Sequence, residues 1–273
     1  MTINLKGELI DLTKPKIMGI LNLTPDSFFD GGKYNSIDRA ITQAEKMICE
    51  GAFFIDLGAC STKPGANEIS EEEEKKRLYP VLERLIEEFP KNHFSIDTYR
   101  ASVAKGCLSK GASIINDISG GQFDHAMMET VGNFGAPYVI MHILGKPRDM
   151  QKNPTYKNVV QEVLYYFSEK IQLAYSNGIN DIIIDPGFGF GKTLEHNYEL
   201  MKNLELFQTL ELPLLVGVSR KSMIYKKLET TPEHALNGTT VLNTTAINKG
   251  ANILRVHDVK EAKECIDLLQ ALQ

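Results

Sequence analysis

"DIIIDPGFGFGKTLEHN", residues 181–197, joins an apolar run to a loop in which glycine and phenylalanine alternate. Two familiar nucleotide-binding patterns come close and fail. A P-loop needs a glycine five residues before its Gly-Lys-Thr, and Pro186 stands there. The Rossmann pattern G-x-G-x-x-G is missed as well, because these glycines read G-x-G-x-G. We therefore interpret the segment as a buried strand followed by a loop that turns away steeply, so that Asp185 points into a site.

Seven further apolar runs of the same kind are spaced along the chain, with helical patterns between them. They are rich in Ile, Val, Leu and Phe without clean polar alternation, which indicates parallel strands buried on both faces. Eight strand–helix units favour an α/β fold of the TIM (β/α)8 barrel type over an open sheet, in a single domain of residues 1–273. The eight runs are KIMGILNLTP (16–25), AFFIDLGA (52–59), HFSIDTY (93–99), ASIINDIS (112–119), PYVIMHI (137–143), DIIIDPG (181–187), LPLLVGVS (212–219) and NILRVHD (252–258).

Two local patterns predict details of this barrel. The first residues, INLKGELIDL, alternate and turn at Lys6-Gly7, so we expect a short N-terminal hairpin that plugs the N-terminal end of the barrel. Residues 70–90 predict a helix that opens with a capping box between Ser70 and Glu73. Its charged residues form pairs at helical spacing, which is typical of a face in water.

Composition limits the classes of function. The 273 residues carry 30 Lys plus Arg against 35 Asp plus Glu, a net charge of −5, which argues against a nucleic-acid-binding face. No apolar run approaches the ~18 residues of a membrane span. The four cysteines form no CxxC pair, and no signal peptide opens the chain, so we expect reduced thiols and a cytoplasmic protein.

Polar residues follow nearly every apolar run, and in a barrel these strand ends meet on one face. One such residue alone is most simply a strand-end or capping residue, but the repetition predicts a site for a polar, partly anionic small molecule. Acceptors and one amide at Asp97, Asn116 and Asp185 suit a heterocycle with a donor edge. The cationic side chains suit an anion, and Asn22 suits Mg²⁺ as an oxygen ligand. For Lys221 and Arg255, the simpler interpretation is a structural salt bridge to the aspartates. This cationic set is Lys63, Lys221, Arg255 and His257.

Two loops after the first two strands are longer than a strand–helix connection needs. They are NLTPDSFFDGGKYNS (22–36) and CSTKPGANEIS (60–70), both rich in Gly, Pro, Ser, Thr and Asn. Long loops at the active face of a barrel often serve as lids, and we expect that role here.

These segments together resemble the successive signatures of the dihydropteroate synthase family, in order, from Met18 to Val259. The segments that carry the resemblance are MGILNLTPDSFFDGG, DLGACSTKPGA, SIDTYRASVA, INDISGG, MH…PRDMQ, DPGFGFGK, SRKSMI and RVHDV. The resemblance implies a TIM barrel, usually a homodimer, that joins 6-hydroxymethyl-7,8-dihydropterin diphosphate to 4-aminobenzoate in folate biosynthesis. It also implies Mg²⁺, release of diphosphate and competition by sulfonamides.

The family implies a role for each matching position. The pterin would be held by Asp97, Asn116, Asp185 and Lys221. The diphosphate would meet Asn22, Thr62, Lys63, Arg255 and His257, with Asn22 on the metal, and 4-aminobenzoate would meet Phe28, Thr62, Pro64 and Ser222. The sequence departs from the family pattern where Cys60 replaces a glutamate, Lys63 an arginine and Phe29 a serine.

Three other readings stay open from the sequence. A pterin-binding methyltetrahydrofolate methyltransferase domain shares the barrel and an Asp–Asn–Asp set, but has no use for SRKSMI or the long first loop. A Schiff-base aldolase would use Lys221 as its nucleophile. A non-catalytic pterin-binding protein is the alternative from outside the enzymes.

Overall fold

The computed structural model describes residues 1–24, 33–60 and 68–272, apart from the side chains of residues 33–36. An eight-stranded parallel sheet forms the centre, in the order β8-β7-β6-β5-β4-β3-β10-β9. A bridge between Ile184 and Leu214 joins β8 to β9 and closes the sheet into a barrel, as the eight apolar runs predict. The strands are β3 (Lys16–Asn22), β4 (Phe54–Gly58), β5 (His93–Asp97), β6 (Ile114–Asp117), β7 (Tyr138–Met141), β8 (Ile182–Asp185), β9 (Leu215–Val216) and β10 (Ile253–Val256).

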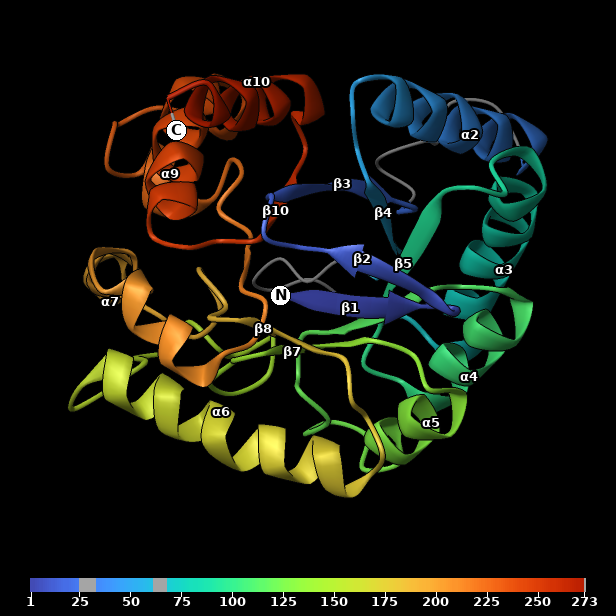
Figure 1. Cartoon of the computed structure of the whole chain (residues 1–273), viewed down its shortest axis with the longest axis horizontal. Coiled ribbons are helices and arrows are strands. Elements are labelled where there is room, and N and C mark those ends of the chain that lie inside the picture. Colours follow the sequence, from blue (N-terminus) through green and yellow to red (C-terminus); the bar gives the residue numbers. More distant parts are fainter. Residues whose placement is uncertain (25–32, 61–67, 273) are drawn as a thin grey trace.

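Helices surround the barrel, as Figure 1 shows. Their inward side chains are mostly apolar and pack against the outer face of the strands, where they form the main hydrophobic core; α9 also buries Thr239 and Asn243. The α-helices are α2 (Lys33–Cys49), α3 (Glu71–Glu88), α4 (Ala101–Lys110), α5 (Met127–Phe134), α6 (Val159–Ser176), α7 (Leu194–Lys202), α8 (Ser222–Tyr225), α9 (Leu236–Asn248) and α10 (Val259–Gln270). The 3-10 helices η1 (Leu204–Leu210) and η2 (Pro232–His234) precede β9 and α9.

The N-terminal hairpin closes one end of the barrel. Strands β1 (Thr2–Leu5) and β2 (Glu8–Asp11) pair antiparallel, and Lys6 and Gly7 make the turn with φ of 54° and 93°. In Figure 1 the hairpin lies across the barrel opening. Its buried side chains pack on a layer with one residue from each of seven strands, which confirms the predicted plug. The layer comprises Ile3, Leu5, Ile10 and Leu12 of the N-terminal segment with Met18, Phe54, Ile114, Val139, Ile183, Leu215 and Ile253.

Helix α3 differs in part from its sequence prediction. The Ser70 hydroxyl accepts a hydrogen bond from the Glu73 amide at 3.2 Å, but the Glu73 carboxylate binds Arg77 instead of completing a capping box. Glu74 lies outside the predicted charged pairs, on the same side of the helix as Leu78, and is buried at 1% exposure. Its carboxylate accepts hydrogen bonds from Thr98, at 2.6 Å, and from Arg100.

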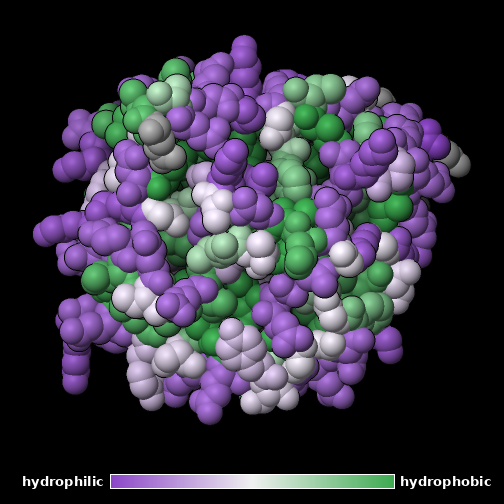
Figure 2. Space-filling view, viewed as in Figure 1, coloured by the Kyte–Doolittle hydropathy of each residue, from purple (hydrophilic) through white to green (hydrophobic). Residues whose placement is uncertain are grey.

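The surface of the hairpin end is mixed, with hydrophilic side chains at the periphery and hydrophobic ones between them (Figure 2). Within the described ranges, no helix is long and apolar enough to cross a membrane. Cys49, Cys60, Cys107 and Cys265 are all free thiols, as the sequence predicts.

Candidate active site

Four polar side chains meet inside the C-terminal end of the barrel. The Arg255 guanidinium donates from Nε to Asp56 Oδ2 at 2.7 Å and from Nη2 to Asp97 Oδ2 at 2.8 Å. The Asn116 amide donates to Asp56 Oδ2 at 3.0 Å. Register explains the meeting, because Asp97 and Asn116 are neighbours on adjacent strands and Asp56 lies deeper by one inward-facing position. The result is a buried, bonded group of carboxylates, amide and guanidinium.

Asp185 and Lys221 form the other wall of this site. Asp185 ends β8 and is 5% exposed; its Oδ1 accepts a hydrogen bond from the Gly187 amide at 2.8 Å. Lys221 precedes α8, and its Nζ donates to the Phe188 carbonyl at 2.6 Å and lies 4.7 Å from the centre of the Phe190 ring. Burial raises the pKa of Asp185, and the nearby positive charge of Lys221 works against that rise.

Burial and neighbouring charge shift the pKa of the groups in this site. Burial raises the pKa of Asp97 to about 7, although the Arg255 charge works against the shift. Burial lowers the pKa of Lys221 to about 8, opposed by Asp185. Clusters of shifted groups are typical of binding and catalytic sites. A buried carboxylate oxygen without a hydrogen bond to the described residues, such as Asp56 Oδ1, favours a ligand that donates one.

Two glycines adjoin these groups, and an added Cβ at either would contact the charged side chains. A side chain at Gly217 would place its Cβ 3.8 Å from the Lys221 nitrogen and 3.7 Å from Arg255 Cβ. At Gly58, the same atom would lie 3.5 Å from Asp97 Cβ. A flat heterocycle with a donor edge fits such a floor of acceptors between a lysine and an arginine.

The structure changes how two predicted cations are understood. Arg255 makes its ion pairs with Asp56 and Asp97, so the salt-bridge alternative describes its contacts, and a role toward diphosphate stays a prediction. His257 sits at the exposed rim, where its Nδ1 lies 3.1 Å from Ser219 Oγ. Burial on the inner side and the Arg255 charge lower the pKa of His257 to about 4. The lowered pKa favours the neutral ring near pH 7, and the contact of His257 with diphosphate stays a prediction.

For two other predicted site residues, Asn22 and Ser222, the structure gives the position in the fold and the burial. Asn22 is half-buried at the end of β3, level with Gly58 in the neighbouring strand. Ser222 is the first residue of α8, half-buried and next to Lys221. The other predicted contact residues lie outside the described residues: Phe28, Thr62, Lys63 and Pro64. So does Phe29, which, like Lys63, departs from the family pattern.

Asn22 is the residue predicted to bind Mg²⁺, and it lies at the end of β3. In residues 1–24, 33–60 and 68–272, no three histidine, cysteine or carboxylate side chains gather into a metal-binding cluster. Magnesium is usually held by one or two protein ligands together with substrate phosphates. A carboxamide oxygen such as that of Asn22 is the type of ligand that Mg²⁺ takes, and its role toward the metal stays a prediction.

Sequence reasoning missed two residues that the structure brings to the site. Asp56 lies inside the apolar run 52–59, and the structure shows it as the partner of Arg255 and Asn116; its other oxygen, Oδ1, is buried without a hydrogen bond to the described residues. In the sequence, Lys192 stands out only as the lysine of an incomplete P-loop pattern. In the structure it is 2% exposed and lies beneath residues 187–191, the glycine loop. The signal for Asp56 was its position within a wholly apolar run, where an aspartate needs a buried partner. Nothing local signalled Lys192.

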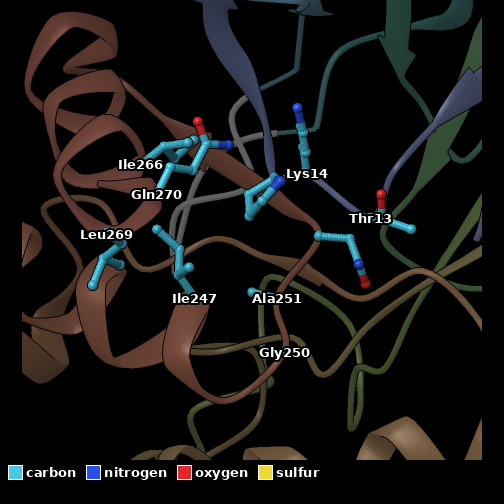
Figure 3. Close-up of a pocket in the computed structure, with 10 residues that line it drawn as sticks. Thr13, Lys14, Ile247, Gly250, Ala251, Ile266, Leu269 and Gln270 are labelled. Carbon is cyan, nitrogen blue, oxygen red and sulfur yellow. The ribbon is translucent and has the colours of Figure 1, made fainter. Parts of the chain in front are cut away.

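A cavity of about 310 Å³ lies elsewhere, between α9, α10 and the segment after the hairpin (Figure 3). Thr13, Lys14, Gly250 and Gln270 are among its lining residues. Gly250 precedes β10, so the cavity is at the N-terminal end of the barrel. None of the predicted site residues lines it, and we do not place the function there.

The chain belongs to the pterin-binding enzyme family, whose pattern it matches over residues 18–257. It is similar to the dihydropteroate synthase of Escherichia coli K12, with 44% identity over 97% of this chain and 94% of that one. A solved Yersinia pestis dihydropteroate synthase in a sulfonamide complex has a TM-score of 0.94 at 42% identity, covering 100% of this chain and 99% of that chain.

A Xanthomonas albilineans dihydropteroate synthase solved with 4-aminobenzoic acid has a TM-score of 0.93 at 35% identity, covering 100% of this chain and 98% of that chain. These three relatives are all synthases, and the likeness extends over nearly the whole of each chain. That favours the synthase over the methyltransferase, aldolase and non-catalytic readings of the sequence.

Proposed function

We propose that this chain joins 6-hydroxymethyl-7,8-dihydropterin diphosphate to 4-aminobenzoate, giving 7,8-dihydropteroate and diphosphate in folate biosynthesis. The observation that carries the proposal is the meeting of buried Asn116 and Asp185 with the half-buried Asp97 and Lys221, at one end of a barrel whose relatives are dihydropteroate synthases. These acceptors match the amine and amide donors along one edge of a pterin.

In this proposal the protein positions the substrates and stabilises charge. The carboxylates and Asn116 accept hydrogen bonds from the pterin, and the buried ring holds its methylene carbon toward the open rim. The arylamine is already a competent nucleophile, so no general base is needed, and the main contribution is orientation. Lys221 and Arg255 supply positive potential on the side where the diphosphate departs.

The diphosphate and its metal are assigned to the rim. Asn22, Thr62, Lys63, Arg255 and His257 form this proposed set, with Asn22 as a ligand of Mg²⁺. Magnesium, when bound, neutralises charge on the leaving oxygens. The neutral His257 can donate one hydrogen bond to a phosphate oxygen. Arg255 Nη1, which makes no hydrogen bond within the described part of the chain, is the guanidinium nitrogen left for the same group.

The aminobenzoate is assigned to the mouth, where Phe28, Thr62, Pro64 and Ser222 would border it. The solved Xanthomonas relative with 4-aminobenzoic acid and the Yersinia relative with a sulfonamide support this substrate and sulfonamides as its competitors. We also propose that the protein is a homodimer, on the basis of the family resemblance. The four free thiols support a cytoplasmic location. Sedimentation equilibrium tests the dimer.

The test of the function is diphosphate release from the pterin diphosphate, with and without 4-aminobenzoate, and with the product identified by mass. We expect release to require the arylamine and to match dihydropteroate formed one for one. Asp185→Asn, which we expect to bind the pterin weakly, serves as the control with reduced release. Release without the arylamine identifies a hydrolase, and pterin binding without any turnover identifies a non-catalytic protein; either result rejects the proposal.

A further inference from the structure

Lys192 is enclosed below the glycine loop in a ring of acceptors. Its Nζ lies 2.9 Å from His142 Nδ1, 3.0 Å from the carbonyl oxygens of Gly187 and Phe190, and 3.3 Å from the carbonyl of His142. An ammonium group has three N–H donors, so four acceptors use all of them. With 2% exposure, this lysine cannot reach a phosphate, which gives the physical reason why the segment is no P-loop.

The backbone carbonyls of the glycine loop are fully hydrogen-bonded. Five consecutive peptide oxygens, from residue 187 to residue 191, each accept a side-chain hydrogen bond. Buried carbonyls need such partners, because each one left unmade costs about 1–3 kcal/mol. The donors are Lys192 to Gly187 and Phe190, Lys221 to Phe188, Gln151 to Gly189, and Tyr156 to Gly191.

The glycine positions show how closely the loop lies against the segment after β7. A Cβ at Gly187 would be 2.0 Å from the His142 carbonyl oxygen, and one at Gly191 would be 2.5 Å from the Leu144 carbonyl oxygen. Both glycines have positive φ, 71° and 62°. Two stretches of backbone therefore touch without side chains between them, and Lys192 spans their junction by binding carbonyls on both.

We propose that Lys192 is a positioning residue of the pterin pocket. The loop that it fixes carries two direct supports of the site: the Gly187 amide holds Asp185 Oδ1 at 2.8 Å, and the Phe188 carbonyl holds the Lys221 nitrogen at 2.6 Å. Lys192 itself meets no substrate. It sets the distance between the Asp185 carboxylate and the Lys221 ammonium, which the pterin must fit. The inference rests on the proposed synthase function.

The test compares Lys192→Met with Lys202→Met. Methionine keeps the length of the side chain but has no donors, and Lys202 is an exposed lysine on α7. We expect Lys192→Met to raise the KM and the dissociation constant for the pterin diphosphate by about 10–100-fold. The turnover number at saturation and the KM for 4-aminobenzoate should change less than threefold. Lys202→Met should leave all four quantities as they are.

A milder variant keeps the test decisive if Lys192→Met does not fold. Tyr156→Phe removes only the hydroxyl that donates to the Gly191 carbonyl at 2.8 Å, and we expect a rise of about three- to tenfold in the pterin KM alone. Equal losses in turnover and in both KM values, or an unchanged pterin KM in either folded variant, overturn the positioning role. Wild-type protein that binds the pterin but forms no dihydropteroate rejects the synthase function instead, and the pterin titrations then still judge Lys192.

Discussion

Asp185 is the residue that connects the glycine loop to the site. Its carboxylate holds the Gly187 amide and faces the charge of Lys221. We expect Asp185→Asn to weaken pterin binding by about 10–150-fold, because a charge-assisted hydrogen bond contributes about 1.5–3 kcal/mol. The fold should stay intact, since asparagine can still accept from Gly187. Calorimetric titration with the pterin checks this, with Asp149→Asn at an exposed position as control; unchanged affinity removes Asp185 from the pocket.

Because the pKa of Asp97 is raised, we expect pterin binding to depend on pH. Burial raises its pKa to about 7, so the acceptor form grows from about a tenth to nine-tenths of the molecules between pH 6 and pH 8. We expect affinity to rise up to about ninefold over this range. Stability has the opposite sign. The folded carboxyl holds its proton more tightly than the unfolded chain, so the contribution of Asp97 to stability is present below pH 4 and lost as pH rises through 7.

The matched measurement uses Asp97→Asn, which cannot titrate. Pterin titrations and urea unfolding of both proteins at pH 6 and pH 8 separate the two effects. The variant should bind weakly at both pH values with a flat profile. A profile as steep as that of the wild type assigns the titration to another group.

The N-terminal hairpin is an element whose two faces predict different costs. Leu5 is 1% exposed in the barrel plug, and Leu9, two residues past the turn, is 71% exposed. We expect Leu5→Ala to lower the free energy of unfolding by about 2–5 kcal/mol and Leu9→Ala by less than about 0.5 kcal/mol. Urea denaturation of both variants measures the difference. Similar losses at the two positions mean that the hairpin does not plug the barrel.

Helix α3 joins the loop after β5 through one buried ion pair. Glu74 binds Arg100 and Thr98, and Arg100 also donates to the Ile69 carbonyl at 2.7 Å. We expect Glu74→Ala to cost about 3–5 kcal/mol of unfolding free energy, because a buried cation loses its partner. Glu72→Ala, on the solvent face of the same helix with an 86% exposed side chain, should cost less than about 0.5 kcal/mol. Chemical denaturation that ranks the two variants equally contradicts a structural role for the pair.

Ligand binding stabilises the molecule as a whole, because a ligand that binds only the folded state shifts the folding equilibrium toward that state. A pterin that binds only the folded barrel, at a hundred times its dissociation constant, adds about 2.7 kcal/mol of stability. For a chain of this size that corresponds to a rise of about 5 °C in Tm. Thermal unfolding with 6-hydroxymethylpterin measures the rise, and Asp185→Asn should lose most of it. Equal shifts in both proteins place the pterin outside the candidate site.

Local patterns in the sequence were enough for the architecture. Buried strands on a regular spacing, helical stretches between them and the turn at Lys6-Gly7 predicted the barrel and its hairpin, because the face that a residue presents depends on the periodicity of its own element. The same reasoning brought Asp97, Asn116 and Asp185 to one end, since parallel strands end together. It also contained the signal for Glu74, which stands four residues before the buried Leu78 on the apolar stripe of α3.

Only the tertiary structure decided which charged groups face each other. Arg255 meets Asp56 and Asp97 across 199 and 158 residues of sequence, and Lys192 meets His142 across 50. Periodicity states that a side chain points inward, but its partner depends on how strands stagger and how loops pack. A buried charge is stable only with partners at hydrogen-bond distance, and those distances exist only once the barrel has closed. For that reason the chain's own residues predicted where the site lies, whereas the closed fold determined its charges, its neutral His257 and the buried lysine beneath it.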